Sequence, residues 1–77
     1  MILVDYAGHM TSTESEEELH AFATEQLNMK KSYYQNSSCT LKHPHYDLMT
    51  SQMIDKAKEL GAVWVSPQDL VRRAWWR

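Results

Sequence analysis

Helix-start signals at three places divide this chain of 77 residues into short alternating segments. Each signal is a side chain that can accept from a free amide of the first helical turn. The three positions are Ser15 with Glu18, Thr50 or Ser51, and Ser66 with Pro67. Strands that alternate with amphipathic helices are typical of a parallel or mixed sheet covered by helices. We therefore predict a single small α/β domain over residues 1–77.

The apolar pattern predicts about four short strands and three helices, in the order β-α-β-β-α-β-α. The expected strands are Ile2–Val4, which stops at Asp5, then Ser32–Gln35, His45–Met49 and Ala62–Val65. The expected helices end near Asn28, at Gly61 and in Trp75-Trp76. Ala7–Met10 is expected to be a turn or a short extended piece, and Asn36–Thr40 a loop.

The size of the chain limits its core. A domain this short sits near the lower limit for a self-sufficient core. The single cysteine, Cys39, cannot form an internal disulfide, and four ligands at zinc-finger spacing are absent. Small domains without such links often gain stability by self-association, so we expect a homo-oligomer.

The charge balance is close to neutral, with a formal net charge of −2 and a pI near 6.0. Nucleic-acid binding without sequence preference needs a basic surface, so nucleic acid is not an expected partner. No run of apolar residues approaches the roughly 20 of a membrane span. The first residues, MILVDYAG, lack the basic region of a signal peptide. We expect a cytoplasmic protein without a membrane partner.

The most chemically loaded stretch is HPHYDL, residues 43–48. Side chains alternate along a strand, so His43, His45 and Asp47 are expected on one face and Tyr46 on the other. A metal ion, if one binds, would use His45 and Asp47, helped by His9 or Asp5. The same residue types suit general acid–base chemistry, because a carboxylate fixes the tautomer of a neighbouring histidine.

Asp5 and Gln35 both end predicted strands, and α/β sheets bind ligands beyond the carboxyl ends of their strands. We therefore expect one pocket for a small polar ligand such as a nucleotide. Its expected lining is Asp5, His9, Gln35, His45, Tyr46 and Asp47, with Tyr46 open to a core role as well. We expect no cofactor. Gly8 and Gly61 are the only glycines, which excludes the glycine-rich dinucleotide and phosphate loops.

The C-terminal segment combines arginines with two tryptophans, and both residue types are enriched in protein interfaces. We expect Arg72, Trp75 and Trp76 to pack on the sheet or to form an interface with another subunit or a host protein.

The chain resembles the domain of unknown function 4031, a family of small bacterial and phage proteins. The resemblance covers almost the whole length, and its most specific part is His45-Tyr46-Asp47-Leu48 with the upstream pair Tyr34-Gln35. The other shared elements are Asp5 after an apolar strand, His9-Met10, Glu18-Leu19-His20 with Phe22-Ala23, and Gly61-Ala62. The resemblance implies a common fold, a shared polar site and a phage or prophage origin in a bacterial host cell.

Three positions differ from what the family tends to carry. Tyr6 stands where members have a second Asp, Asn28 where they have Gly, and Ser51-Gln52 where basic residues often occur. The first difference weakens a carboxylate-pair metal site, and the last weakens a phosphate clamp.

Three classes of function remain open. The first is a binder of a small ligand such as a nucleotide. The second is a small hydrolase of phosphoesters, assisted by a metal or by His and Asp residues. The third is a phage interaction protein that inhibits a host enzyme. The sequence leaves open whether the protein is an enzyme.

Overall fold

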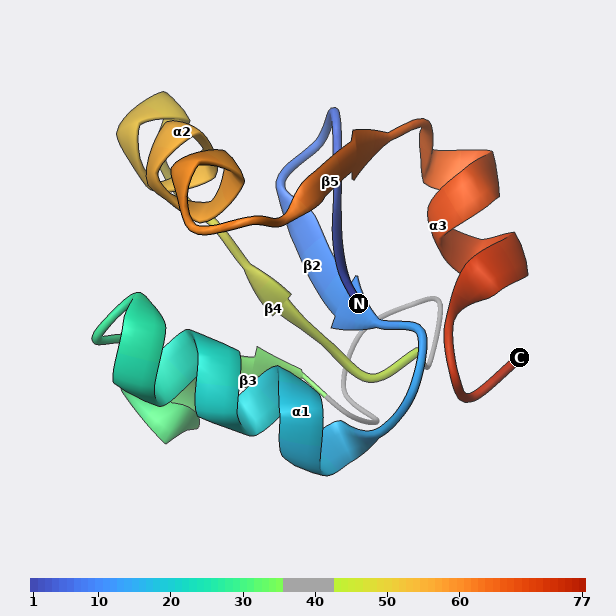
Figure 1. Cartoon of the computed structure of the whole chain (residues 1–77), viewed down its shortest axis with the longest axis horizontal. Coiled ribbons are helices and arrows are strands. Elements are labelled where there is room, and N and C mark those ends of the chain that lie inside the picture. The colour runs from blue at the N-terminus through green and yellow to red at the C-terminus, as the bar shows by residue number, and fades with distance from the viewer. Residues whose placement is uncertain (36–42) are drawn as a thin grey trace.

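The structure is a computed structural model that describes residues 1–35 and 43–77, so the expected loop at 36–40 lies outside the described residues. One mixed sheet carries five strands in the order β3-β4-β2-β1-β5 (Figure 1). The strands are β1 Ile2–Asp5, β2 His9–Ser12, β3 Tyr34–Gln35, β4 His45–Asp47 and β5 Val63–Val65. The helices are α1 Glu16–Ala21, α2 Ser51–Glu59 and α3 Pro67–Arg73. The predicted α/β class is confirmed.

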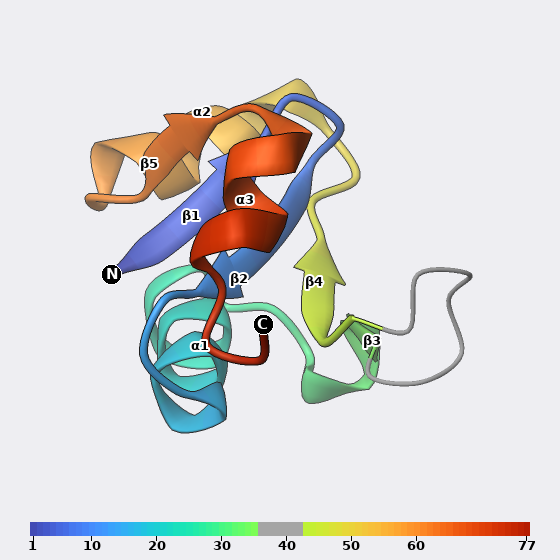
Figure 2. The ribbon, with the colours of Figure 1, turned by 90° about the vertical axis from the view of Figure 1, so that its right-hand side faces the viewer.

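The two faces of the sheet differ in character. Helices α1 and α2 lie on one side of the sheet and α3 lies on the other (Figures 1 and 2). Because side chains alternate along β1, Ile2 and Val4 join the large apolar cluster under α1 and α2, while Leu3 packs with Leu70 of α3. The face toward α3 therefore has a small apolar cluster, and polar side chains occupy much of the remaining area.

Strand β2 is a fifth strand, at a place where the sequence predicted a turn or a short extended piece. The turn at Gly8 reverses the chain, with φ of +92° and a hydrogen bond of 3.1 Å from its amide to the Asp5 carbonyl. The strand that follows pairs antiparallel with β1, for example Val4 with Met10. Its sequence HMTS contains a single apolar residue, so no hydrophobic run marked it as a strand.

The strand directions correct the prediction of a common carboxyl edge. Among the described strand pairs, β1 and β5 run parallel, whereas β1–β2, β2–β4 and β4–β3 are antiparallel. Strand β3 therefore runs opposite to β1, and Asp5 and Gln35 follow strands that point in opposite directions. The β1–β2 hairpin causes this, because it adds a reversed strand before α1, so the connection through α1 leads to a strand with the direction of β2.

The first helix begins at the predicted cap residue, Ser15, but the Glu18 carboxylate does not contact the Ser15 amide. The Ser15 hydroxyl accepts from the Glu18 amide at 3.0 Å. The Ser15 amide donates to the Ser12 hydroxyl, so the Glu18 carboxylate does not close the capping box. That carboxylate instead accepts from the Ser12 hydroxyl and from the Met1 ammonium group. The segment continues through a π-helical turn, Phe22–Gln26, and Asn28 takes the predicted left-handed conformation.

The later helices also have the predicted caps. Thr50 caps α2 and Ser66 caps α3, each through its hydroxyl oxygen. Gly61 has φ of +110° beyond α2. No described helix has the length and apolar character needed to cross a membrane.

Three predicted boundaries were wrong. Helix α3 ends at Arg73, because Ala74 is extended and the Trp75 amide donates to the Ser12 carbonyl at 3.0 Å. The second predicted strand shortens to Tyr34–Gln35 after a 3₁₀ turn over Lys31–Tyr33. Strand β4 ends at Asp47, because the next amide, that of Leu48, donates to the carbonyl of Gly8 in the β1–β2 turn.

Candidate functional site

The polar face of the sheet brings three strands together at one place. Asp5 ends β1, His9 begins β2, and Asp47 ends β4 directly opposite His9 in the register. His45 lies two residues before Asp47 and therefore on the same face of β4. The β1–β2 hairpin thus places residues from both ends of the turn beside the HPHYDL strand.

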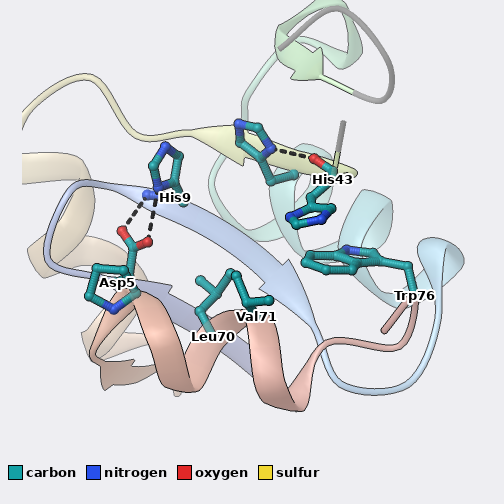
Figure 3. Close-up of a pocket in the computed structure, with 8 residues that line it drawn as sticks. Asp5, His9, His43, Leu70, Val71 and Trp76 are labelled. Atoms are coloured by element: carbon teal, nitrogen blue, oxygen red, sulfur yellow. Dashed lines mark hydrogen bonds and ion pairs between the residues drawn. The ribbon is translucent and has the colours of Figure 1, made fainter. Parts of the chain in front are cut away.

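Asp5 is almost fully buried, at 1% exposed, and both of its carboxylate oxygens accept hydrogen bonds. Oδ1 accepts from the backbone amides of Ala7 and His9, both at 2.9 Å. Oδ2 accepts from His9 Nδ1 at 2.9 Å (Figure 3). A carboxylate can only accept in these bonds, so His9 carries its proton on Nδ1 and presents Nε2 to the site.

His45 is held in the same manner by the backbone. Its ring is buried, and Nδ1 donates to the carbonyl of His43 at 2.6 Å (Figure 3). The carbonyl is an acceptor only, so Nδ1 carries a proton and the lone pair of a neutral ring is on Nε2. That Nε2 atom lies 3.2 Å from Asp47 Oδ1.

The three side chains converge on one point. His9 Nε2 lies 3.9 Å from Asp47 Oδ1, and ligand atoms of His9, His45 and Asp47 all lie within 4.8 Å of one another. The two imidazole rings meet edge to face, with centroids 5.0 Å apart. Ligands bound tetrahedrally at about 2.0–2.1 Å from zinc are about 3.4 Å apart. The cluster is therefore wider than a closed zinc site, and its ligand atoms would move closer together around an ion.

This arrangement has the features of a metal centre. Both imidazoles turn Nε2 toward the carboxylate of Asp47, and with neutral rings a bound cation would stabilise this arrangement. Each imidazole is oriented by an acceptor on its other nitrogen, as ligating histidines usually are. Asp5, expected among the residues that line the ligand pocket, holds His9 in this orientation. His9 and Asp47 are partly exposed, so solvent reaches the centre.

Tyr46 points to the opposite face, as strand alternation allowed. It is fully buried in the larger apolar cluster, and its hydroxyl lies 2.6 Å from His20 Nδ1. Burial and the charge of Glu16 raise the pKa of the Tyr46 phenol. The neighbouring Tyr34 hydroxyl donates to Glu16, and burial with this bond raises the pKa of Tyr34 as well. The structure does not bring Tyr46 to the polar site.

Two hollows border the centre. A small cavity of about 70 Å³ lies between the sheet and α3, lined by Asp5, His9, His43, His45, Pro67, Leu70, Val71 and Trp76 (Figure 3). This is too small for a nucleotide, since ligand pockets usually measure about 300–1,000 Å³. A larger groove of about 480 Å³ includes Asp47 and Gln35. The predicted pocket is therefore divided between two spaces.

Sequence reasoning gave no role to the backbone of His43, and it placed Trp76 on the sheet or at an interface without a contact to His43. The Trp76 ring stacks on the His43 ring, with centroids 4.2 Å apart and planes at 20° (Figure 3). The Trp76 Nε1–H donates to the Pro44 carbonyl at 2.9 Å. These contacts fix the backbone that orients His45. Trp76 lies far from His43 and Pro44 in the sequence, and no local sequence pattern predicts contacts between such distant residues.

The other residues predicted at an interface have contacts within the chain. Trp75 packs against the larger apolar cluster, and Arg72 is exposed beside Asp69, with which it forms an ion pair of 3.2 Å. An interface with another chain through this segment stays a prediction.

Together, the fold and the site define a small α/β protein with a His–His–Asp cluster on the polar face of its sheet. The chain belongs to the family described as protein of unknown function (DUF4031), whose model matches residues 4–76. This confirms the resemblance seen in the sequence. No curated protein and no solved structure shows a significant match to the chain.

Proposed function

We propose that this protein binds a divalent metal ion of the zinc class through His9, His45 and Asp47, and that the loaded protein hydrolyses phosphoesters. One observation carries the proposal. Both histidines hold their Nδ1 protons against fixed acceptors, while their Nε2 atoms converge on one carboxylate oxygen. That is the orientation that metal-binding histidines adopt.

The number and exposure of the ligands favour a catalytic centre. Structural zinc sites are closed by four protein ligands, whereas catalytic sites use three and leave a position open. The cluster offers three, and the side chains of His9 and Asp47 are 33% and 41% exposed. A substrate can therefore reach the open position from solvent.

The chemistry follows from the charge of the ion. A zinc ion with three protein ligands lowers the pKa of a coordinated water to about 7 and attracts the oxygens of an anionic phosphoryl group. Asp5 and the His43 carbonyl, which hold the two Nδ1 atoms, would keep the imidazoles oriented toward a bound ion. A phosphoester suits this centre because its negative charge binds the ion directly.

Zinc titration by isothermal calorimetry tests the binding step. The protein should bind one zinc ion per chain, and His45→Gln should lose most of the affinity. His20→Gln is the matched control, since His20 lies on the opposite face against Tyr46 and should bind zinc normally. Equal affinity in both variants, or no binding by the unmodified protein, would contradict the proposed centre.

Hydrolysis of bis(p-nitrophenyl) phosphate tests the reaction. The zinc-loaded protein should release nitrophenol, lose this activity in a chelator and regain it on addition of zinc. His45→Gln should remain inactive at zinc concentrations that saturate His20→Gln. Turnover that survives the chelator would contradict a metal-assisted reaction.

A second candidate is the binding of a small ligand such as a nucleotide without turnover. The groove of about 480 Å³ beside Asp47 favours it, because its volume lies in the usual range for small-molecule pockets. Native mass spectrometry of the purified protein would detect a retained ligand. An unchanged ligand after incubation with zinc would favour this candidate over hydrolysis.

A further inference from the structure

The larger groove includes the proposed metal ligand Asp47 in its lining, together with residues outside the metal cluster. Its lining consists of Met29, Tyr33, Gln35, Asp47, Met49 and Met53. The register pairs Gln35 with His45, so Gln35 lies on the same face of the sheet as His45 and Asp47, and Tyr33, in the 3₁₀ turn just before β3, joins it in the groove lining. One carboxylate therefore belongs both to the proposed metal centre and to the groove.

The groove has a defined chemical character. Three of its six lining residues are methionines and one is a tyrosine, and Tyr33 and Met49 are 50% and 78% exposed. Among the residues that the structure describes, those lining the groove include no lysine or arginine. Its one carboxylate repels anions unless an ion is bound to it. An anionic group would therefore bind at the metal and an uncharged group in the groove.

We propose that this groove is the subsite for an uncharged aromatic ring joined to the phosphate group that the metal binds. This rests on the proposed function, and it specifies the substrate class. Tyrosine offers a flat face on which a ring can stack, and thioether sulfurs make favourable contacts with aromatic edges. The adaptable methionine side chains can close around such a ring, and a nucleobase is one ring of this kind.

The test compares two phosphonates, because these cannot be hydrolysed and share the group that binds the ion. Binding of phenylphosphonate and methylphosphonate to the zinc-loaded protein is measured by calorimetry. Phenylphosphonate should bind at least about tenfold more tightly, as expected for stacking on an aromatic side chain. Tyr33→Ala should remove most of this difference and leave zinc affinity unchanged.

Tyr6→Ala is the matched control. Tyr6 is also an exposed tyrosine, but it packs edge to face on Trp64, outside the groove lining. This variant should keep the full preference for phenylphosphonate. If zinc binds and the two phosphonates bind equally, the aromatic subsite is wrong and the metal centre stands. If zinc does not bind, both proposals are wrong.

Discussion

One acceptor oxygen on Asp5 and one on His43 determine which ring nitrogen His9 and His45 turn toward the candidate site. The Asp5 carboxylate combines two tasks, because one oxygen holds the turn amides and the other holds His9. The His43 carbonyl does the same for His45. A change at either acceptor should therefore alter the centre without removing a proposed metal ligand.

Asp5→Asn should lower zinc affinity by about 10- to 100-fold, the usual effect of losing an outer-shell partner. An amide can keep one oxygen on the backbone amides, but its NH₂ group then faces His9 Nδ1 and opposes the required tautomer. Calorimetric titration with zinc measures the loss. Asp69→Asn, the same change at an exposed ion pair with Arg72, should leave zinc affinity unaltered. An Asp5→Asn protein that is folded and binds zinc normally would show that Asp5 does not orient His9.

At the scale of elements, the β1–β2 hairpin joins the turn to the end of β4. Gly8 accepts from the Leu48 amide at 2.8 Å, and its positive φ lets the chain turn between Asp5 and His9. The close approach leaves no space for a side chain, because a Cβ at Gly8 would lie 2.6 Å from the Leu48 carbonyl oxygen. The turn between β1 and β2 therefore requires glycine at this position.

Gly8→Ala should lower the free energy of unfolding by more than about 1 kcal/mol, the usual cost of left-handed backbone for alanine, since the steric clash adds to it. Gly61→Ala is the control. It has a similar φ of +110° but no neighbour within 4 Å of an added Cβ. Urea unfolding measures both variants. Equal losses would mean that the contact with Leu48 adds nothing.

The opposite face of the sheet supplies a prediction on pH. Burial and the bond to Glu16 raise the pKa of Tyr34 above its ordinary 10.0, so the folded state holds the phenol proton more tightly than the unfolded state. Stability from this group is therefore complete below about pH 10 and falls as the pH rises toward the folded pKa. Tyr34→Phe should reduce the alkaline loss of stability in urea unfolding. Tyr6→Phe, which removes a more exposed phenol, is the control and should reduce it less.

At the scale of the whole molecule, the segment after α3 reaches back to the start of β4. The Trp76 ring covers His43, and its Nε1–H shares the Pro44 carbonyl with the Thr11 hydroxyl. Contacts between positions 76, 44 and 11 thus connect three distant parts of the chain at the backbone that orients His45. This segment contributes to the candidate site through packing.

Trp76→Phe should retain ring stacking on His43 and lose the indole hydrogen bond, at a cost of about 0.5–1.5 kcal/mol in unfolding free energy. Trp76→Leu should cost more and should also weaken zinc binding, because the His43 backbone loses its cover. Trp64→Phe changes a half-exposed tryptophan on β5 and should leave zinc affinity unchanged. Thermal unfolding and zinc titration measure the three variants. Normal zinc affinity in folded Trp76→Leu would show that the segment does not support the site.

The sequence by itself determined the local features of this protein. Ser15, Thr50 and Ser66 cap their helices because a cap depends on a side chain and amides within the next three residues. Alternation along β4 correctly separated Tyr46 from His45 and Asp47, because it is a property of any extended chain. The family was also evident from short residue patterns and agrees with the match over residues 4–76.

Only the tertiary structure decided how these local features meet. The antiparallel pairing of β2 with β4 sets His9 opposite Asp47, and the packing of Trp76 fixes the backbone before His45. The mainly polar sequence of β2 gave no strand signal, and the direction of β3 follows from successive antiparallel pairings. The pairing of His9 with Asp47 and the hydrogen bond from Trp76 to Pro44 join residues more than thirty positions apart. Their free energy comes from burial and hydrogen bonding across the whole fold, which no local pattern in the sequence records.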